Sequence, residues 1–470
     1  MPTYRMDAVL TGDGWRHDAA VEVSPQGMIT AIGTGGDAGE HPAAQRIRGA
    51  VVPGMPNAHS HAFQRAMAGD AEFRSGTQES FWTWRNAMYS LANCIEPAEL
   101  ELIATQLFIE MLRAGYTSVA EFHYLHHPVL GGNRPGHNEL WEAVDRAALA
   151  AGIGLTLLPT LYMTSDFGAR PLLPEQRRFG MQVTQFLAAV AARRSSLRSA
   201  TGSLLHTGAS LHSLRAVPLD ALRDAVLGLR AQDPDGVIHI HVAEQLREVA
   251  ACVQDTGRRP IELLLDTGLL DARWCLVHAT HTTAAEIRGV AASGACICVC
   301  PGTEGNLGDG FFDAARLLRA GGALSIGSDS QATVDPLEEL RWLEYQQRIR
   351  RRGRSVLAAR REPHVGARLW REAAASGGAV MGQPVGRLAA GCRADWLVLD
   401  TAHPALAGAS EDRILDRLVF GPSRGAIRHV MVAGRWVIRD GRHAEEGAVA
   451  ERFSLWQARR GAVAGASGEA

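Results

Sequence analysis

The chain of 470 residues contains no lysine, because all 48 residues of the Lys and Arg class are arginine. This absence excludes every chemistry that depends on a lysine amine, including a Schiff base, an anchor for pyridoxal phosphate and the lysine of a nucleotide-binding P-loop. It also excludes a carboxylated lysine that bridges two metal ions. Any metal-dependent catalysis in this chain must use other ligands.

Excess charge, paired cysteines and long apolar runs are also missing. A net charge of −2 gives no field that would hold nucleic acid or an anionic membrane, so we expect neither as a partner. The seven cysteines form no Cys-x-x-Cys pair, and no secretory signal opens the chain. Without an apolar run of about 18 residues, no membrane span is predicted. These features predict a cytoplasmic protein with free thiols.

One segment is strongly basic. Residues 346–361, QQRIRRRGRSVLAARR, hold seven arginines and no acid. A run of this kind can bind nucleic acid, whereas the alternative is a solvated helix face. The acidic balance of the whole chain favours the second interpretation.

Both ends of the chain show short strands separated by Gly and Asp turns. Residues 1–50 contain several such strands, and residues 385–445 contain more, with a hairpin that turns at Ala433 and Gly434. We therefore predict a small β-sandwich domain formed by 1–50 together with 385–445. Residues 446–470 are expected to be a C-terminal helix or tail.

The centre of the chain, residues 51–384, alternates between apolar, β-rich runs and helical stretches. This alternation predicts an α/β fold, specifically a (β/α)8 barrel of the TIM type. A long segment rich in Arg and Ala, 163–206, is inserted between the third and fourth strands. The eight predicted strands are 50–61, 117–124, 153–162, 207–214, 237–244, 274–281, 295–301 and 323–330.

Barrel enzymes carry their chemistry at the carboxyl ends of the strands, and several metal-binding residue types fall there. His59 and His61 end the first strand at a spacing that puts both imidazoles on one face. His241, His278 and Asp329 end the fifth, sixth and eighth strands. Neutral imidazoles with one carboxylate suit a catalytic Zn²⁺, with Fe²⁺ as the second choice.

Two other groups compete for the same interpretation. His239 shares a face with His241 but lies one layer deeper, which favours a packed histidine or one that supports a ligand. Cys296, Cys298 and Cys300 alternate on one strand face and could bind a metal as thiolates. Their position within a buried strand favours small core residues instead.

The motif PGMPNAHSH (53–61), the histidines of the fifth and sixth strands and the aspartate of the eighth resemble the amidohydrolase superfamily. The absence of lysine places the chain with the members that hold one metal ion. In that branch the pattern His-x-x-Glu, here His241 to Glu244, accompanies deaminases. We therefore expect Glu244 to carry a proton to departing ammonia, Asp329 to accept the proton of the attacking water and His278 to stabilise the tetrahedral centre.

The predicted mouth of the barrel contains groups suited to carboxylates. Arg85 lies in FWTWRNAMY (81–89) and Arg215 in SLHSLRAV (210–217), and Tyr124 and His212 lie nearby in the predicted fold. Guanidinium groups bind carboxylates through two parallel hydrogen bonds, which suggests a small-molecule substrate with two carboxylates. Surface ion pairs are the alternative in a chain with 48 arginines.

Several longer motifs are similar to the deiminases of this superfamily that act on formimidoyl-glutamate in histidine catabolism. They are PNAHSHAFQRAMAG (56–69), FWTWRNAMY (81–89), EFHYLHH (121–127), SLHSLRAV (210–217), IHIHVAEQ (238–245), PGTEGNLGDG (301–310) and SIGSDSQ (325–331). The resemblance covers nearly the whole chain and is weakest in 163–206 and after 440. It implies a homodimer that converts N-formimidoyl-L-glutamate and water to N-formyl-L-glutamate and ammonia. A related deaminase or chlorohydrolase acting on an aminated heterocycle remains the alternative. The resemblance also implies that His59, His61, His241 and Asp329 hold zinc, and that Gln64, Arg85, Tyr124, His212 and Arg215 bind the glutamate portion.

Overall fold

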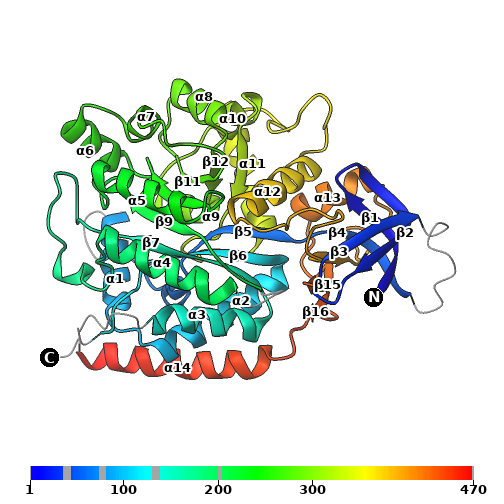
Figure 1. Ribbon diagram of the computed structural model, residues 1–470. Coiled ribbons are helices and arrows are strands. Elements are labelled where there is room, and N and C mark those ends of the chain that lie inside the picture. Colours follow the sequence, from blue (N-terminus) through cyan, green and yellow to red (C-terminus); the bar gives the residue numbers. More distant parts are fainter. Residues whose placement is uncertain (1, 35–43, 74–80, 130–137, 199–203, 468–470) are drawn as a thin grey trace.

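The computed structural model describes residues 2–34, 44–73, 81–129, 138–198 and 204–467. Two sheets organise the chain, and Figure 1 shows the smaller one beside the larger, helix-covered one. The larger sheet is the predicted barrel. Its parallel strands follow one another in chain order, which confirms the (β/α)8 architecture of the TIM type.

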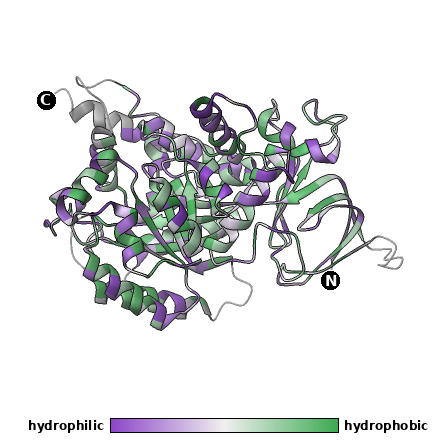
Figure 2. Ribbon diagram, turned by 90° about the horizontal axis from the view of Figure 1, so that it is seen from above, coloured by the Kyte–Doolittle hydropathy of each residue, from purple (hydrophilic) through white to green (hydrophobic). Residues whose placement is uncertain are grey.

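All eight predicted strands are present in the barrel. Their residues are almost entirely buried, because helices cover the outer face and side chains fill the interior. Figure 2 shows hydrophobic ribbon concentrated in these central strands. The barrel strands are β5 (Met55–Ser60), β6 (Tyr116–His123), β7 (Gly154–Leu161), β9 (Ala209–Ser213), β10 (Ile238–Val242), β11 (Trp274–His278), β12 (Cys296–Val299) and β13 (Ala323–Ile326), and the short β8 (Leu205–Thr207) pairs with β7.

Helices alternate with these strands and pack around them. Gly115, Gly152 and Gly294 end three of the helices in the left-handed conformation, where glycine has no Cβ penalty. The helices of this layer are α2 (Pro97–Ala114), α3 (Glu139–Ala151), α4 (Val183–Arg198), α5 (Leu219–Gln232), α6 (Leu246–Thr256), α7 (Pro260–Asp266), α8 (Ala284–Ser293), α9 (Pro301–Leu307), α10 (Ala314–Arg319), α11 (Pro336–Arg351) and α12 (Val365–Val380).

The barrel closes between its first and last strands at their carboxyl ends. Ser60 and Asp329 form a parallel β-bridge there. The N–H of Asp329 donates to the carbonyl of His59 at 3.0 Å, and the N–H of His61 donates to the carbonyl of Asp329 at 3.1 Å. The segments that carry the candidate metal ligands therefore close the barrel themselves.

Short elements follow the strand ends and cover the mouth of the barrel. The 3-10 helix η1 (Ala62–Met67) continues directly from His61, and α1 (Phe81–Ala92) lies farther along the same connection. The inserted segment 163–206 contributes η2 (Pro174–Gln176) and α4. Residues 199–203 of that segment lie outside the described part of the chain.

The second sheet is built from both ends of the chain, as predicted. Its seven strands form one hydrogen-bonded path in the order β16-β15-β14-β4-β1-β2-β3. Tyr4, Trp396 and Trp436 pack edge to face in its core. The strands are β1 (Thr3–Thr11), β2 (Gly14–Val23), β3 (Ile29–Thr34), β4 (Gln45–Pro53), β14 (Trp396–Leu399), β15 (Ile427–Val432) and β16 (Arg435–Ile438).

Two helices complete the structure. α13 (Glu411–Phe420) packs against α12, and α14 (Glu446–Ser467) lies against α2 on the outside of the barrel (Figure 1). Trp456 of α14 donates its indole N–H to Glu99 of α2 at 2.9 Å. Among the helices that the structure describes, none combines the length and the apolar character needed to cross a bilayer.

Candidate metal centre and active site

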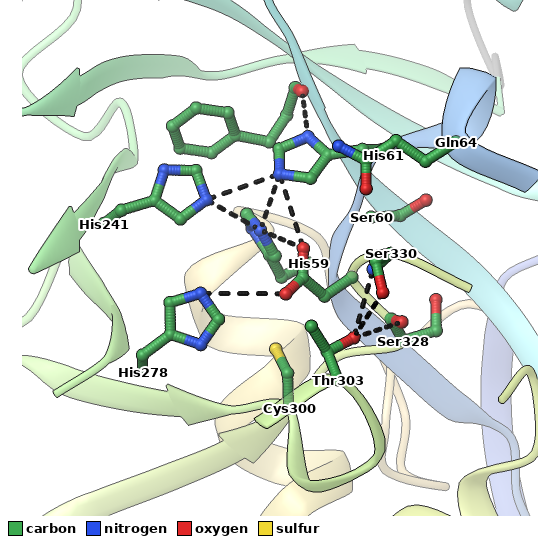
Figure 3. A network of polar contacts seen from close by, with 12 residues as sticks. His59, Ser60, His61, Gln64, His241, His278, Cys300, Thr303, Ser328 and Ser330 are labelled. Atoms are coloured by element: carbon green, nitrogen blue, oxygen red, sulfur yellow. Dashed lines mark hydrogen bonds and ion pairs between the residues drawn. The ribbon is translucent and has the colours of Figure 1, made fainter. Parts of the chain in front are cut away.

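Three imidazoles and one carboxylate converge where the barrel closes (Figure 3). The Nε2 atoms of His59, His61 and His241 lie 3.1–3.3 Å from one another. Oδ1 of Asp329 lies 3.4 Å from Nε2 of both His59 and His61. All four side chains are buried. The structure thus brings together the four residues that were predicted to hold a metal.

The outer hydrogen bonds of two of these imidazoles fix which nitrogen faces the centre. Nδ1 of His61 lies 2.8 Å from the carbonyl oxygen of Phe122, and Nδ1 of His241 lies 3.0 Å from the carbonyl oxygen of His212. A carbonyl can only accept, so each Nδ1 carries a proton and each Nε2 presents a lone pair. Burial and the neighbouring His59 lower the pKa of His61 to about 3, which keeps it in the neutral, metal-binding form.

This donor set fits a divalent metal ion. Two fixed lone pairs, the Nε2 of His59 and a carboxylate oxygen face each other in a buried space, and a cation between them would satisfy all four. Donors at roughly 2.0–2.1 Å from a common zinc-type centre lie about 3 Å apart, which agrees with the observed separations. Three imidazoles with one carboxylate are typical ligands for zinc, and they also accept iron.

The backbone is strained at several of the strand ends that form this site. Ala243, His278, Ala279 and Asp329 all have φ between 47° and 69°, a region that residues other than glycine rarely adopt. Each follows or ends a barrel strand, so the turn redirects the chain at the mouth of the barrel. Such strain persists where the surrounding structure holds it, which is common at functional sites.

His278 and Glu244 lie beside the metal ligands. Nε2 of His278 is 3.6 Å from Oδ2 of Asp329 and 3.8 Å from Oε1 of Glu244. Burial opposes protonation of His278, but the carboxylates of Glu244, Glu304 and Asp329 outweigh it and raise its pKa well above the usual value. Burial raises the pKa of Glu244 to about 7, which leaves both of its protonation states accessible near neutral pH.

Two buried carboxylates that were not predicted position these groups. Oε1 of Glu304 lies 3.3 Å from Nδ1 of His278 and also accepts from the N–H of Cys300 at 2.9 Å. Glu248 accepts from the N–H groups of Ala243 and Glu244, each at 3.0 Å. Glu304 lies in the motif PGTEGNLGDG (301–310), whereas Glu248 offers only its spacing of four residues after Glu244 as a signal.

The residues predicted to bind a carboxylate-bearing substrate line one pocket above the metal ligands. The wall of this pocket also contains His61, His241, Glu244, His278 and Asp329. Nε2 of Gln64 donates to the hydroxyl of Tyr124 at 2.9 Å. The five predicted residues in the wall are Gln64, Arg85, Tyr124, His212 and Arg215.

Arg85 and Arg215 bring positive charge to this pocket. Arg85 lies in α1 and Arg215 follows β9, and Arg215 is only 8% exposed. In the described part of the chain, neither guanidinium forms an ion pair, and Nε of Arg85 is buried without a hydrogen-bond partner. Burial lowers the pKa of Arg85, and the charge of Arg215 adds to this effect. A pocket with two such cations favours an anionic ligand.

The competing residues occupy structural positions. Nε2 of His239 lies 2.7 Å from the carbonyl oxygen of Val380 in α12. Cys296, Cys298 and Cys300 are buried in a cluster with Ala58, Val277 and other apolar residues. His278, Cys300 and Asp329 could also hold an ion together, but this trio shares Asp329 with the first cluster and therefore adds no independent site.

The basic segment 346–361 is partly neutralised. Arg348 pairs with Glu344 at 2.7 Å, and Arg351 pairs with Asp313 at 2.6 Å. Arg350 donates to the carbonyl oxygen of Phe311 at 3.1 Å. These contacts agree with the interpretation of its first part as a helix face, but α11 ends at Arg351, so residues 352–361 lie beyond the helix.

The chain is similar in sequence and in fold to known proteins. Formimidoylglutamate deiminase of Pseudomonas aeruginosa is 47% identical over 447 residues, which is 95% of this chain and 97% of that protein. The 5-methylthioadenosine/S-adenosylhomocysteine deaminase of Halobacterium salinarum is 28% identical and covers 83% of this chain and 81% of its own. A crystal structure of an amidohydrolase from Brucella melitensis has a TM-score of 0.90 at 38% identity, over 98% of this chain and 99% of its own. The model of the Amidohydrolase family matches residues 50–437, and the chain belongs to that family.

Proposed function

We propose that this enzyme hydrolyses N-formimidoyl-L-glutamate to N-formyl-L-glutamate and ammonia. The single observation that carries the proposal is the pocket in which two arginines without ion-pair partners among the described residues face a His/His/His/Asp metal site. The relative at 47% identity, a formimidoylglutamate deiminase, supports the same substrate. The chemistry requires both parts of the pocket, because a linear amidine must be attacked at one end and held by its carboxylates at the other.

We further propose zinc as the metal, held by His59, His61, His241 and Asp329, with iron as the second choice. The neutral imidazoles and the single carboxylate support this choice. When bound, the ion supplies Lewis-acid chemistry that lowers the pKa of water toward neutrality.

The protein groups around this site account for the proton transfers. Asp329 takes a proton as the water oxygen forms its bond to the formimidoyl carbon, and His278 donates a hydrogen bond to the developing oxyanion. As the water oxygen adds, the C=N bond becomes a single bond and Glu244 protonates the terminal nitrogen to an amino group. Glu244 then passes on the proton that Asp329 took from the water, so the nitrogen leaves as neutral ammonia when the C–N bond breaks. The second water proton is lost from the hydroxyl as the formyl C=O forms, and it restores the protonated state of Glu244.

The remaining pocket residues would hold the glutamate portion. Arg85 and Arg215 supply the two positive charges for a dicarboxylate, and Gln64, Tyr124 and His212 supply neutral hydrogen-bonding groups. His212 also bonds to a metal ligand through its carbonyl oxygen, since His241 donates to it at 3.0 Å. The metal site and the carboxylate site are therefore joined by one residue.

The proposal is tested by ammonia release from N-formimidoyl-L-glutamate by the zinc-reconstituted protein. Guanine, cytosine and adenosine serve as parallel substrates. Release from the formimidoyl compound alone supports the proposal. Release from a heterocycle alone contradicts it and supports the alternative, a deaminase of aminated heterocycles within the same family.

We also propose an organisation and a setting for the enzyme. The catalytic unit is assigned to 51–384, the small β domain to 1–50 with 385–445, and a C-terminal helix or tail to 446–470.

A homodimer is expected and is measurable by light scattering. A cytoplasmic location is supported by the seven cysteines, which are all free thiols. Nucleic acid is not expected as a partner, and binding that persists at moderate salt would contradict this.

A further inference from the structure

Gln176 is a buried amide that joins two tyrosines at the edge of the substrate pocket. It ends η2, within the inserted segment 163–206, and has no exposed surface. Its Nε2 donates to the hydroxyl oxygen of Tyr89 at 3.0 Å and to that of Tyr162 at 2.9 Å. Its Oε1 accepts from the N–H of Leu173 at 2.9 Å, which fixes the orientation of the amide.

The two tyrosines reach the pocket from different elements. Tyr89 lies in α1 and is 5% exposed, whereas Tyr162 directly follows β7 and is 1% exposed. Both line the pocket that contains the metal ligands. Each also contacts an arginine of the pocket. Nη1 of Arg215 donates to the hydroxyl of Tyr162 at 3.5 Å, and the guanidinium of Arg85 lies 5.4 Å from the centre of the Tyr89 ring.

Counting hydrogen bonds shows that the two phenol oxygens offer fewer lone pairs than the five donors around them need. Gln176 brings two N–H groups, Arg215 brings one, and the tyrosines bring one O–H each. The two phenol oxygens offer four lone pairs, and three of these are occupied by the N–H donors. If one tyrosine donates to the other, no phenol lone pair remains for the second O–H. A buried donor needs a partner, so an acceptor in the pocket must supply it.

The charge of the surroundings identifies the acceptor as an anion. Arg215 contacts Tyr162 and Arg85 contacts Tyr89, so each tyrosine has an arginine beside it. Neither arginine forms an ion pair among the described residues. Burial raises the pKa of Tyr162 well above its usual value, so its hydroxyl stays a donor at neutral pH. A carboxylate accepts several hydrogen bonds at once and matches the guanidinium geometry.

We propose that Tyr89 and Tyr162 donate hydrogen bonds to one carboxylate of the substrate beside Arg215, and that Gln176 is the positioning residue of this subsite. The inference rests on the proposed dicarboxylate substrate and specifies which further groups bind it. Gln176 occupies one lone pair on each phenol oxygen and holds both hydroxyls in place, so that their protons can point to the substrate. The inserted segment thereby supplies a specificity determinant to the barrel.

Kinetics of Y89F, Y162F and Q176E with N-formimidoyl-L-glutamate test the proposal. Each tyrosine variant loses one hydrogen bond to a charged group, so we expect KM to rise about 10- to 100-fold while kcat changes by less than about threefold. In Q176E the carboxylate accepts both phenol protons and repels the substrate, while its oxygen still accepts from Leu173. We expect KM to rise in this variant too. Y345F, on the exposed part of α11, is the matched control and should leave both constants unchanged.

Two truncated substrates identify the carboxylate. N-formimidoyl-4-aminobutyrate lacks one carboxylate of the substrate, and N-formimidoyl-norvaline lacks the other. The tyrosine variants should lower kcat/KM for only one of these two compounds. An equal effect on both, or a KM for N-formimidoyl-L-glutamate within twofold of the wild type in Y89F and Y162F, overturns the proposal.

Binding of glutarate by calorimetry separates this inference from the proposed function. Glutarate carries two carboxylates and no reacting group. If the wild type releases no ammonia from N-formimidoyl-L-glutamate but binds glutarate at least tenfold more tightly than Y162F does, the proposed function fails and the subsite stands. If the wild type turns over the substrate but glutarate affinity is the same in both proteins, the subsite fails and the proposed function stands.

Discussion

The backbone N–H of Asp329 donates to the carbonyl oxygen of His59 at 3.0 Å, and both residues also present side chains to the metal centre. The hydrogen bond that closes the barrel therefore also brings two of the metal ligands together. Gly327 makes this approach possible, because a Cβ at that position would lie 2.7 Å from Cβ of His59 and 2.8 Å from its carbonyl oxygen. Backbone and ligand must move together if this contact is altered.

Substitution G327A is expected to lower both stability and metal content. Overpacking at a site that cannot yield costs about 1–3 kcal/mol, and here the displaced group is a metal ligand. Calorimetry of the melting transition and metal analysis after dialysis measure the two effects. G305A in α9 is the control, because an added Cβ there meets no described atom within 4 Å. A G327A protein with wild-type zinc content and melting temperature would contradict the argument.

Substitution E244Q should leave the metal bound and reduce kcat by about 10²–10⁴-fold, because the amide cannot carry a proton to the leaving nitrogen. Its backbone anchor on Glu248 is retained, so the fold at the end of β10 should not change. Zinc content and single-turnover ammonia release measure the two outcomes. Turnover near the wild-type rate would remove Glu244 from the path of the proton.

Glu304 is expected to act by orienting His278. E304Q keeps an oxygen that can accept from His278 and from Cys300, whereas E304A removes both contacts. We therefore expect kcat to fall more in E304A than in E304Q, by about tenfold or more, a loss typical of groups that support a catalytic histidine. Equal kcat values in the two variants would show that the contact with His278 has no role in turnover.

Substitution R215M should abolish activity on the dicarboxylate while zinc remains bound. Removal of one partner of a buried charge contact costs about 3–5 kcal/mol, which corresponds to a loss of roughly 10²–10³-fold or more in kcat/KM. Ammonia release and metal analysis on the same preparation provide the measurement. R354M, in the exposed segment after α11 and away from the pocket, is the matched control. Retained affinity for the substrate in R215M would count against the carboxylate site.

Glu121 should make folding stability depend on pH. It is 1% exposed, its Oε1 accepts from the N–H of Ala62 at 2.6 Å, and its Oε2 is without a partner among the described residues. Burial raises its pKa to about 8, from an ordinary value of about 4.5. Between these values the folded state holds the proton and the unfolded state does not, so stability falls as pH rises through this range.

Substitution E121Q removes this group from the titration and keeps an acceptor for Ala62. The melting temperature of E121Q relative to the wild type should therefore increase progressively from pH 5 to pH 8. The measurement is a series of thermal melts of both proteins in matched buffers with saturating zinc. A difference that stays constant over this range would show that Glu121 does not titrate between the two states.

The sequence by itself determined the architecture and most of the site. Buried strands that alternate with helices leave few ways to cover both faces of a parallel sheet, so the barrel followed from periodicity alone. Strand ends of a barrel meet at one face, and for this reason His59, His61, His241 and Asp329 could be placed together. The absence of lysine excludes a carboxylated lysine that bridges two metals, which predicts a single ion at this site.

Only the tertiary structure decided which other groups reach this site. Gln176 lies in an insertion without periodicity, and nothing in its neighbours along the chain indicates that it touches Tyr89 and Tyr162. The role of Glu304 likewise depends on the turn with positive φ at His278 and on a contact between separate segments. Glu248 bonds locally, across the turn with positive φ at Ala243. Strand ends share a position that the fold dictates, whereas loop residues meet through packing between segments far apart in sequence. The first kind of proximity is encoded in periodicity, and the second arises only when the chain is folded.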